Sequence, residues 1–375
     1  MPRSTLYPSL GLDIMNGLKQ SLKQQQVFDK IQLLIDNIGY GTDEPGIYAK
    51  AEKMLLQEDA DLVIVCADSG IAQMLQPLFT ATGKILLVLN FGANLPASWQ
   101  AEPTSLTLSL NFCLHTKLTG RLAALTAGKQ VANVVSYFDG GYNQCFSMLN
   151  SNRDHGGIPR FNHVTHLKPE AFTLQPLVDF LEENKDVQTL LCLFSGEEAG
   201  RFYQGIASIQ QKNGLDLFVS PMMVDDTFKK DDALQIQRVQ GFVPWHASLQ
   251  NEANELFKRQ VRTGTTRANY FSLLGWEAGL LLANVCLQAA AGQADAAAMV
   301  TALTQERYNS PRGWLKIDAG THHGYGPSWQ VSVHDDLEVK IENEAAGMEE
   351  EWKTFSREPL PGTEISGWRN TYLCI

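Results

Sequence analysis

Three apolar runs of strand length lie in the first two hundred residues, and each ends in a turn of small or polar residues that leads into a helical pattern. The runs span residues 61–66, 84–89 and 189–194. Strands that alternate with helices of about 10–15 residues indicate βαβ units and a parallel sheet. In such sheets, ligands bind beyond the carboxyl ends of the strands, where turn residues and helix N-termini point outward. The three turns are therefore where we expect the function of the chain to reside.

The same alternation continues along both halves of the chain. A first series runs from a strand at 31–36, through a helix at 44–57, to about residue 100, and a second series begins at Gln130. After residue 240 the pattern predicts helices at 248–263, 270–291 and 294–307, followed by strands at 314–318, 328–334 and 337–341. The two series are similar in layout, so we predict an α/β fold with two doubly wound, Rossmann-like lobes.

The size and charge of the chain limit its domain number and its possible partners. A chain of 375 residues exceeds what one hydrophobic core usually serves, so two domains are expected. The net charge is -11 and no basic stripe is present, which argues against nucleic acid and anionic membrane surfaces as partners. The apolar helix around 278–291 is shorter than the roughly 20 residues that a bilayer requires, so no membrane insertion is predicted. Residues 1–5 lack the apolar stretch of a signal peptide, so we expect either a cytoplasmic chain or one whose export signal has been removed.

Reactive motifs are scarce in this sequence. Six cysteines are scattered without CxxC spacing and are predicted to be free thiols, most of them buried. A disulfide stays open as the alternative, because the sequence alone does not fix cysteine pairing. No GxGxxG or GxxxxGK motif follows a strand, and Leu193 takes the place of the first glycine of a GxSxG elbow. The histidines have no metal-binding context, so we predict no cofactor, no metal and no catalytic residue. An α/β enzyme that uses Glu197, Asp225 or Asp139 as an acid or base stays open as an alternative.

Several loops resemble, in order and over nearly the whole chain, those of a known family. The family is that of the type I periplasmic solute-binding proteins of ABC transporters, in particular the branch that binds leucine, isoleucine and valine, amides and urea. The similar motifs are Ser4–Gly11, Ala67–Gly70, Asn90–Pro96, Ser136–Tyr142, Tyr270–Glu277 and Ser310–Gly313.

The resemblance implies two lobes that close over one small ligand and are joined by a hinge with three crossings. Lobe 1 is expected to comprise residues 1–115 and 246–325, and lobe 2 residues 116–245 and 326–375. The closed form is expected to deliver its ligand to an ABC permease outside the cytoplasm, in the periplasm or its equivalent. A ligand-sensing domain of a receptor or regulator with the same fold is the alternative. The family's first strand precedes the position of Ser4, where this sequence has only three residues.

The resemblance also places the ligand contacts on facing loops of the two lobes. Ser69 is expected to hold an anionic or carbonyl end of the ligand, and Glu197 an ammonium group. Both residues also suit a simpler role at a helix N-terminus. The ligand is therefore predicted to be an amino acid or a related amide or carboxylate. The full predicted set is Tyr7, Leu10, Asp68, Ser69, Phe91, Gly92, Ala93 and Asn94 from lobe 1, and Tyr142, Glu197, Met223 and Asp225 from lobe 2.

Overall fold

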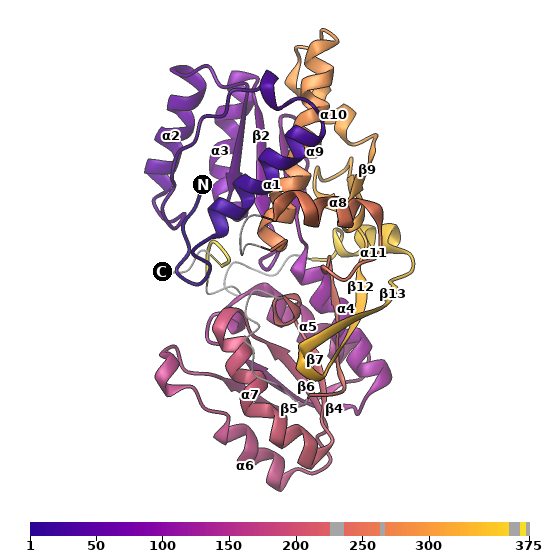
Figure 1. Cartoon of the computed structure of the whole chain (residues 1–375). Coiled ribbons are helices and arrows are strands. Elements are labelled where there is room, and N and C mark those ends of the chain that lie inside the picture. Colours follow the sequence, from indigo (N-terminus) through magenta and orange to yellow (C-terminus); the bar gives the residue numbers. More distant parts are fainter. Residues whose placement is uncertain (226–235, 263–266, 360–367, 373–375) are drawn as a thin grey trace.

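The molecule consists of two α/β lobes, one above the other in Figure 1. The structure, a computed structural model, describes residues 1–225, 236–262, 267–359 and 368–372. The upper lobe holds a parallel sheet in the order β1-β2-β3, and the lower lobe a sheet in the order β13-β12-β8-β7-β6-β4-β5. A small antiparallel sheet, β11-β10-β9, adjoins β3 through a bridge between Thr107 and His323. The predicted α/β fold with two wound lobes is confirmed.

The upper lobe takes its elements from the first hundred residues and from the region after residue 250. Asp43 begins its second helix because the carboxylate accepts the Gly46 N–H (3.1 Å), and Pro45 suits the first turn. The strands are β1 (Leu62–Cys66), β2 (Ile85–Asn90), β3 (Ser105–Ser109), β9 (Arg307–Ser310), β10 (Gly313–Ile317) and β11 (Gly324–Tyr325). The helices are α1 (Leu10–Gln24), α2 (Glu44–Leu56), α3 (Ser69–Thr82), α8 (Glu252–Val261), α9 (Tyr270–Ala290) and α10 (Ala296–Leu303).

The lower lobe is built around a strand that is buried along its whole length, β6 (Thr189–Leu193). Its parallel neighbours are β4 (Gln130–Val135) and β7 (Asp216–Val219). The remaining strands are β5 (Ile158–Val164), β8 (Val239–Val243), β12 (Trp329–His334) and β13 (Glu338–Glu344), and the helices are α5 (Asn143–Asp154), α6 (Gln175–Glu183) and α7 (Gly196–Asn213). A strand buried on both faces is typical of a parallel sheet covered by helices, as the continuous apolar run predicted.

The connections between the lobes run through the middle of the molecule (Figure 1). The described chain passes from β3 to β4 through α4 (Phe112–Thr126), from β8 towards β9, and from β11 to β12. Near these connections, α11 (Met348–Phe355) packs its Trp352 in one apolar cluster with Leu114 and Leu118 of α4. The ends of strands from both lobes therefore face each other across a boundary crossed by several segments.

The strand predicted at residues 31–36 is absent, and this prediction is wrong. The segment is not in a ladder, and Leu34 and Ile35 are 40% and 58% exposed. Backbone bonds join Ile38 N–H to the Met1 carbonyl (3.1 Å) and Arg3 N–H to the Gly39 carbonyl (2.7 Å). A strand requires a partner along its length, and both of these bonds lie beyond residue 36.

The five described cysteines are free thiols, as predicted. Cys66, Cys113, Cys145 and Cys192 are buried, Cys286 is half-buried, and Cys374 lies outside the described residues. Burial raises the pKa of Cys66 to about 12. This thiol is therefore protonated at neutral pH, which suits a packing role more than a reactive one.

The apolar helix α9 is longer than the sequence pattern suggested. It has 21 residues, and its length and composition would allow it to cross a membrane. The prediction that this helix is too short to span a bilayer is therefore wrong. However, 72% of its most apolar window is buried inside the molecule. It packs closely against α1, with Gly17 and Gly275 at the contact. We therefore interpret α9 as the core helix of the upper lobe.

Replacing Gly275 with alanine is expected to destabilise the upper lobe by about 1–3 kcal/mol, the usual cost of overpacking. A Cβ atom at this position lies 1.9 Å from the backbone carbonyl oxygen of Ile14, so the two helices must move apart. Gly70→Ala in α3 is the control, because its Cβ atom meets nothing within 4 Å. Urea unfolding of both variants measures the difference, and equal stabilities contradict the close packing.

Candidate ligand-binding site

The loop after β2 reaches across the boundary and touches the start of α5. The Ala93 carbonyl accepts the Gln144 N–H (2.9 Å), and the Asn94 side-chain oxygen accepts the Asn143 N–H (3.2 Å). In return, the Asn143 side-chain oxygen accepts the Leu95 N–H (2.9 Å). These bonds draw the two lobes together at one point, beside the loops predicted to bind a ligand.

An aromatic chamber occupies the interior next to this contact. Its centre is filled by the ring of Tyr372, which is 0% exposed. Four aromatic rings from both lobes surround it with centroid distances of 5.4–6.1 Å, and all four pairs are edge-to-face; these rings belong to Tyr7, Phe91, Phe112 and Tyr142. Edge-to-face contact is one of the favourable geometries of aromatic pairs, so the four rings stabilise the buried Tyr372 ring.

A buried carboxylate closes the polar end of the chamber. Asp139 is 0% exposed and accepts hydrogen bonds from the hydroxyls of Ser136 (2.6 Å) and Ser195 (2.8 Å). Its other oxygen accepts from the Gln144 amide (3.3 Å) and from the Tyr372 hydroxyl (3.4 Å), and that amide also donates to the hydroxyl (2.9 Å). Burial raises the pKa of Asp139, while the hydroxyl donors oppose the rise. The Tyr372 hydroxyl therefore has one acceptor, Asp139, and one donor, Gln144.

The backbone of the segment 368–372 is held by side chains of the surrounding loops. Asp68 accepts from the Thr371 N–H and from the Thr371 hydroxyl (both 3.0 Å), and Asn94 donates to the Trp368 carbonyl (2.7 Å). Burial raises the pKa of Asp68, and the bonds from Thr371 and Asn94 partly offset that effect. The segment thus bridges the loops after β1 and β2.

Most residues predicted for the site lie in or around the chamber. Tyr7, Phe91 and Tyr142 line it, Leu10 is buried in the same cluster, and Asp68 and Asn94 hold the segment described above. The Tyr7 hydroxyl accepts the Gly196 N–H at the start of α7 (2.9 Å). Burial, followed by the charges of Asp225 and Asp139, raises the pKa of Tyr7 well above its ordinary value. Asp225 itself is 5% exposed.

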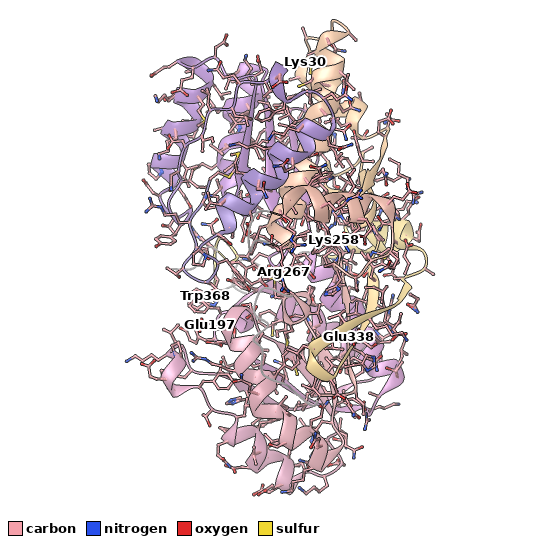
Figure 2. The ribbon with its side chains drawn as sticks, viewed as in Figure 1. Lys30, Glu197, Lys258, Arg267, Glu338 and Trp368 are labelled. Atoms are coloured by element: carbon pink, nitrogen blue, oxygen red, sulfur yellow. The ribbon has the colours of Figure 1, made fainter. Side chains whose placement is uncertain are left out.

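Two predicted residues, Glu197 and Met223, have side chains that lie outside the chamber. The Glu197 side chain is 73% exposed and lies 3.7 Å from Arg201, one turn further along the exposed face of α7. Figure 2 shows it at the outer edge of the boundary between the lobes, near Trp368. Met223 packs in the core of the lower lobe, where its carbonyl accepts the Tyr203 hydroxyl (3.1 Å). At the start of α7, the residue that reaches the chamber is Gly196, whose backbone N–H bonds to the Tyr7 hydroxyl.

Three further predicted residues lie in the loops after β1 and β2, and two of them have structural positions. Gly92 has φ +65°, and a Cβ atom there would lie 2.6 Å from Asn111 Cα, so glycine is required for the turn. Ala93 is fully buried in the loop that contacts α5. Ser69 lines a polar cavity of about 240 Å³ beside the loop, together with His322 and His323, and the other predicted residues do not line this cavity.

Sequence reasoning missed the residues that complete the chamber. The sequence pattern offers Asp139 only as an enzymatic acid or base and does not single out Gln144 or Tyr372. Ser136 and Asp139 follow the buried strand β4, in the loop whose motif resembles the start of the second lobe, and this position after a strand is the signal that points to them. Nothing in the local sequence indicates that Tyr372 returns to a loop 230 residues earlier in the chain, at Tyr142.

Comparison with known proteins agrees with this architecture. The sequence model of the periplasmic binding protein family matches residues 2–337, which is most of the chain. The chain belongs to the periplasmic binding protein family. No curated protein matches it.

Solved structures of periplasmic binding proteins share its fold at low sequence identity. A solute-binding protein of an ABC transporter from Rhodopseudomonas palustris, in complex with 3,4-dihydroxybenzoic acid, is 17% identical with TM-score 0.69 and coverage of 90% of this chain and 93% of that one. Another from R. palustris, in complex with 4-hydroxybenzoate, is 15% identical with TM-score 0.67 and coverage of 92% and 94%. A branched-chain amino acid binding protein from Streptococcus pneumoniae, in complex with isoleucine, is 12% identical with TM-score 0.67 and coverage of 92% and 96%.

Proposed function

We propose that this periplasmic binding protein captures a small aromatic ligand with a ring hydroxyl in the chamber between its lobes. The observation that carries the proposal is the chamber itself, in which four rings enclose a phenol whose hydroxyl meets Asp139 and Gln144. An aliphatic amino acid leaves these polar partners unmatched, which is costly in a buried site. Two similar folds bind hydroxylated benzoates, which is consistent with this ligand class.

The other end of the ligand is expected to meet hydroxyl groups. Next to the Tyr372 ring, the Ser4 hydroxyl donates to the Tyr372 carbonyl (2.6 Å), and the Tyr142 hydroxyl accepts the Tyr372 N–H (3.1 Å). A carboxylate or an amino acid head group placed there finds the same partners. The proposed class therefore includes hydroxylated aromatic acids and tyrosine, and it revises the earlier expectation of a Glu197-bound ammonium.

Delivery to an ABC permease outside the cytoplasm completes the proposed role. Contacts to both lobes favour the closed state, since only a difference in affinity between states shifts the equilibrium. Lobe 1 is taken as residues 1–115 and 246–325, and lobe 2 as 116–245 and 326–375. Residues of the chamber come from both parts, with Phe91 in the first and Tyr142 in the second.

Titration calorimetry with matched pairs of compounds tests the ligand class. We expect 4-hydroxybenzoate and L-tyrosine to bind at least ten times more tightly than benzoate and L-phenylalanine, because the ligands without a hydroxyl leave Asp139 and Gln144 without their partner. Binding of L-isoleucine with no binding of either phenol contradicts the proposal. Native mass spectrometry of the purified protein adds a check on retained cargo.

A further inference from the structure

We propose that the segment 368–372 is an internal competitor of the solute, with Tyr372 occupying the ligand chamber until a ligand displaces it. The inference rests on the proposed function, because a competitor requires a ligand that uses the same chamber. The position of Tyr372 is the first observation that supports the inference. Its ring fills the centre of the chamber, its hydroxyl bonds to Gln144 and its backbone N–H bonds to the Tyr142 hydroxyl.

The segment 368–372 contacts both lobes, as a ligand bound between the lobes would. Thr371 bonds to Asp68 at the end of β1, whereas the Tyr372 hydroxyl bonds to Asp139 beyond the end of β4. Trp368 lies against the rings of Tyr137 and Phe138 of the lower lobe, with centroids 5.4 and 5.6 Å away. Bonds to both lobes stabilise the closed arrangement, so a docked segment is expected to hold the lobes together without a solute.

The way the segment is held makes it displaceable. Four of its backbone bonds have side-chain partners, namely Asp68, Asn94, Tyr142 and Ser4, and these groups can serve a small ligand equally well. A docked strand would instead commit its backbone to a ladder. Exchange of one set of side-chain bonds for another requires no rearrangement of either sheet.

Competition lowers the apparent affinity for a solute in proportion to the fraction of molecules with an open chamber. Undocking the segment therefore raises the affinity, whereas damaging the chamber lowers it. This opposite sign separates an internal competitor from an ordinary part of the core. The variant that undocks the segment must leave every residue of the chamber in place.

Gly141→Ala meets that requirement. A Cβ atom at Gly141 would lie 1.9 Å from the Trp368 ring, so the ring must leave its place, and Gly141 has no positive φ that would strain alanine. Gly128→Ala is the matched control, because the nearest atom to its Cβ is at 3.4 Å, in Thr189, which is an ordinary contact. Neither variant changes one of the chamber residues named above.

Calorimetry with 4-hydroxybenzoate and L-tyrosine on the full chain tests the inference. We expect Gly141→Ala to bind the better of these two compounds at least fivefold more tightly than the wild type and than Gly128→Ala. Tyr372→Ala removes the competing ring itself and is expected to give a gain of tenfold or more. Unchanged or weaker binding in Gly141→Ala and Tyr372→Ala, with intact melting temperatures, overturns the inference and leaves the ligand class standing.

Hydrogen exchange of the wild type gives a readout that needs no variant. The Thr371 and Tyr372 amides are expected to exchange slowly without ligand and at least ten times faster when the chamber is saturated with 4-hydroxybenzoate or L-tyrosine. If a compound binds while these amides stay protected, the segment does not compete and the inference fails. If neither compound binds to the wild type, Gly141→Ala or Tyr372→Ala, the proposed ligand class fails, and the inference fails with it.

Discussion

Replacing Arg312 with methionine is expected to lower the free energy of unfolding by about 3–5 kcal/mol. Arg312 and Glu277 are 1% and 0% exposed and form a two-pronged ion pair, with the Nε and Nη2 atoms 2.7 and 2.6 Å from the two carboxylate oxygens. The Ser310 hydroxyl also donates to Glu277 (2.5 Å). Removing the guanidinium leaves a buried carboxylate with one hydroxyl donor, and that uncompensated charge is the source of the loss.

The double variant Glu277→Leu with Arg312→Met is the control for this prediction. It removes both charges and fills the space with apolar side chains, so it is expected to recover most of the stability that the single variant loses. Urea unfolding of the wild type, both single variants and the double variant completes a mutant cycle. A single variant as stable as the wild type contradicts the uncompensated charge as the cause.

This ion pair explains two motifs that the sequence presented separately. Residues 270–277 lie on α9, and residues 310–313 join β9 to β10. Both motifs supported the resemblance to solute-binding proteins, yet their charged residues meet inside the upper lobe and not in the chamber. The sequence order revealed the family, whereas the contact between the motifs required the fold.

Strands were predictable from the sequence where burial makes nearly every side chain of the strand apolar. The apolar runs at 61–66, 84–89 and 189–194 became β1, β2 and β6, because a strand covered on both faces has apolar side chains at nearly every position. The run at 31–36 has the same character but lacks a partner along its length. Pairing depends on distant chain segments, so composition cannot decide it.

The candidate site was predictable at the level of loops but not of every side chain. The loops after β1, β2 and β4 do converge, as the carboxyl ends of parallel strands require. The start of α7 also converges, but its backbone at Gly196 faces Tyr7, while the next side chain, Glu197, faces solvent. One residue of a helix turns the side chain by about 100°, which follows from 3.6 residues per turn. A small error in register therefore exchanges a ligand contact for a surface residue.

Replacing Asp139 with alanine is expected to reduce the preference for 4-hydroxybenzoate over benzoate by about tenfold, because the ligand hydroxyl loses its acceptor. A hydrogen bond to a charged group contributes about 1.5–3 kcal/mol, and about 1.4 kcal/mol corresponds to tenfold in affinity. Asp139→Asn keeps one oxygen that can accept from the ligand hydroxyl, so its loss is expected to be smaller. Calorimetry with 4-hydroxybenzoate and benzoate on the wild type, Asp139→Asn and Asp139→Ala measures the two losses.

The comparison with benzoate makes this prediction specific to the hydroxyl group. Both compounds compete with the same segment 368–372, so the ratio of their affinities cancels any change in how firmly Tyr372 is docked. Asp139 bonds to the Tyr372 hydroxyl in the present geometry, and benzoate has no hydroxyl, so Asp139→Ala is expected to lower the ratio, while the Gln144 amide still donates to the hydroxyl. If both compounds lose the same factor, Asp139 acts only by supporting Ser136 and Ser195, and the recognition of a phenol must lie elsewhere in the chamber.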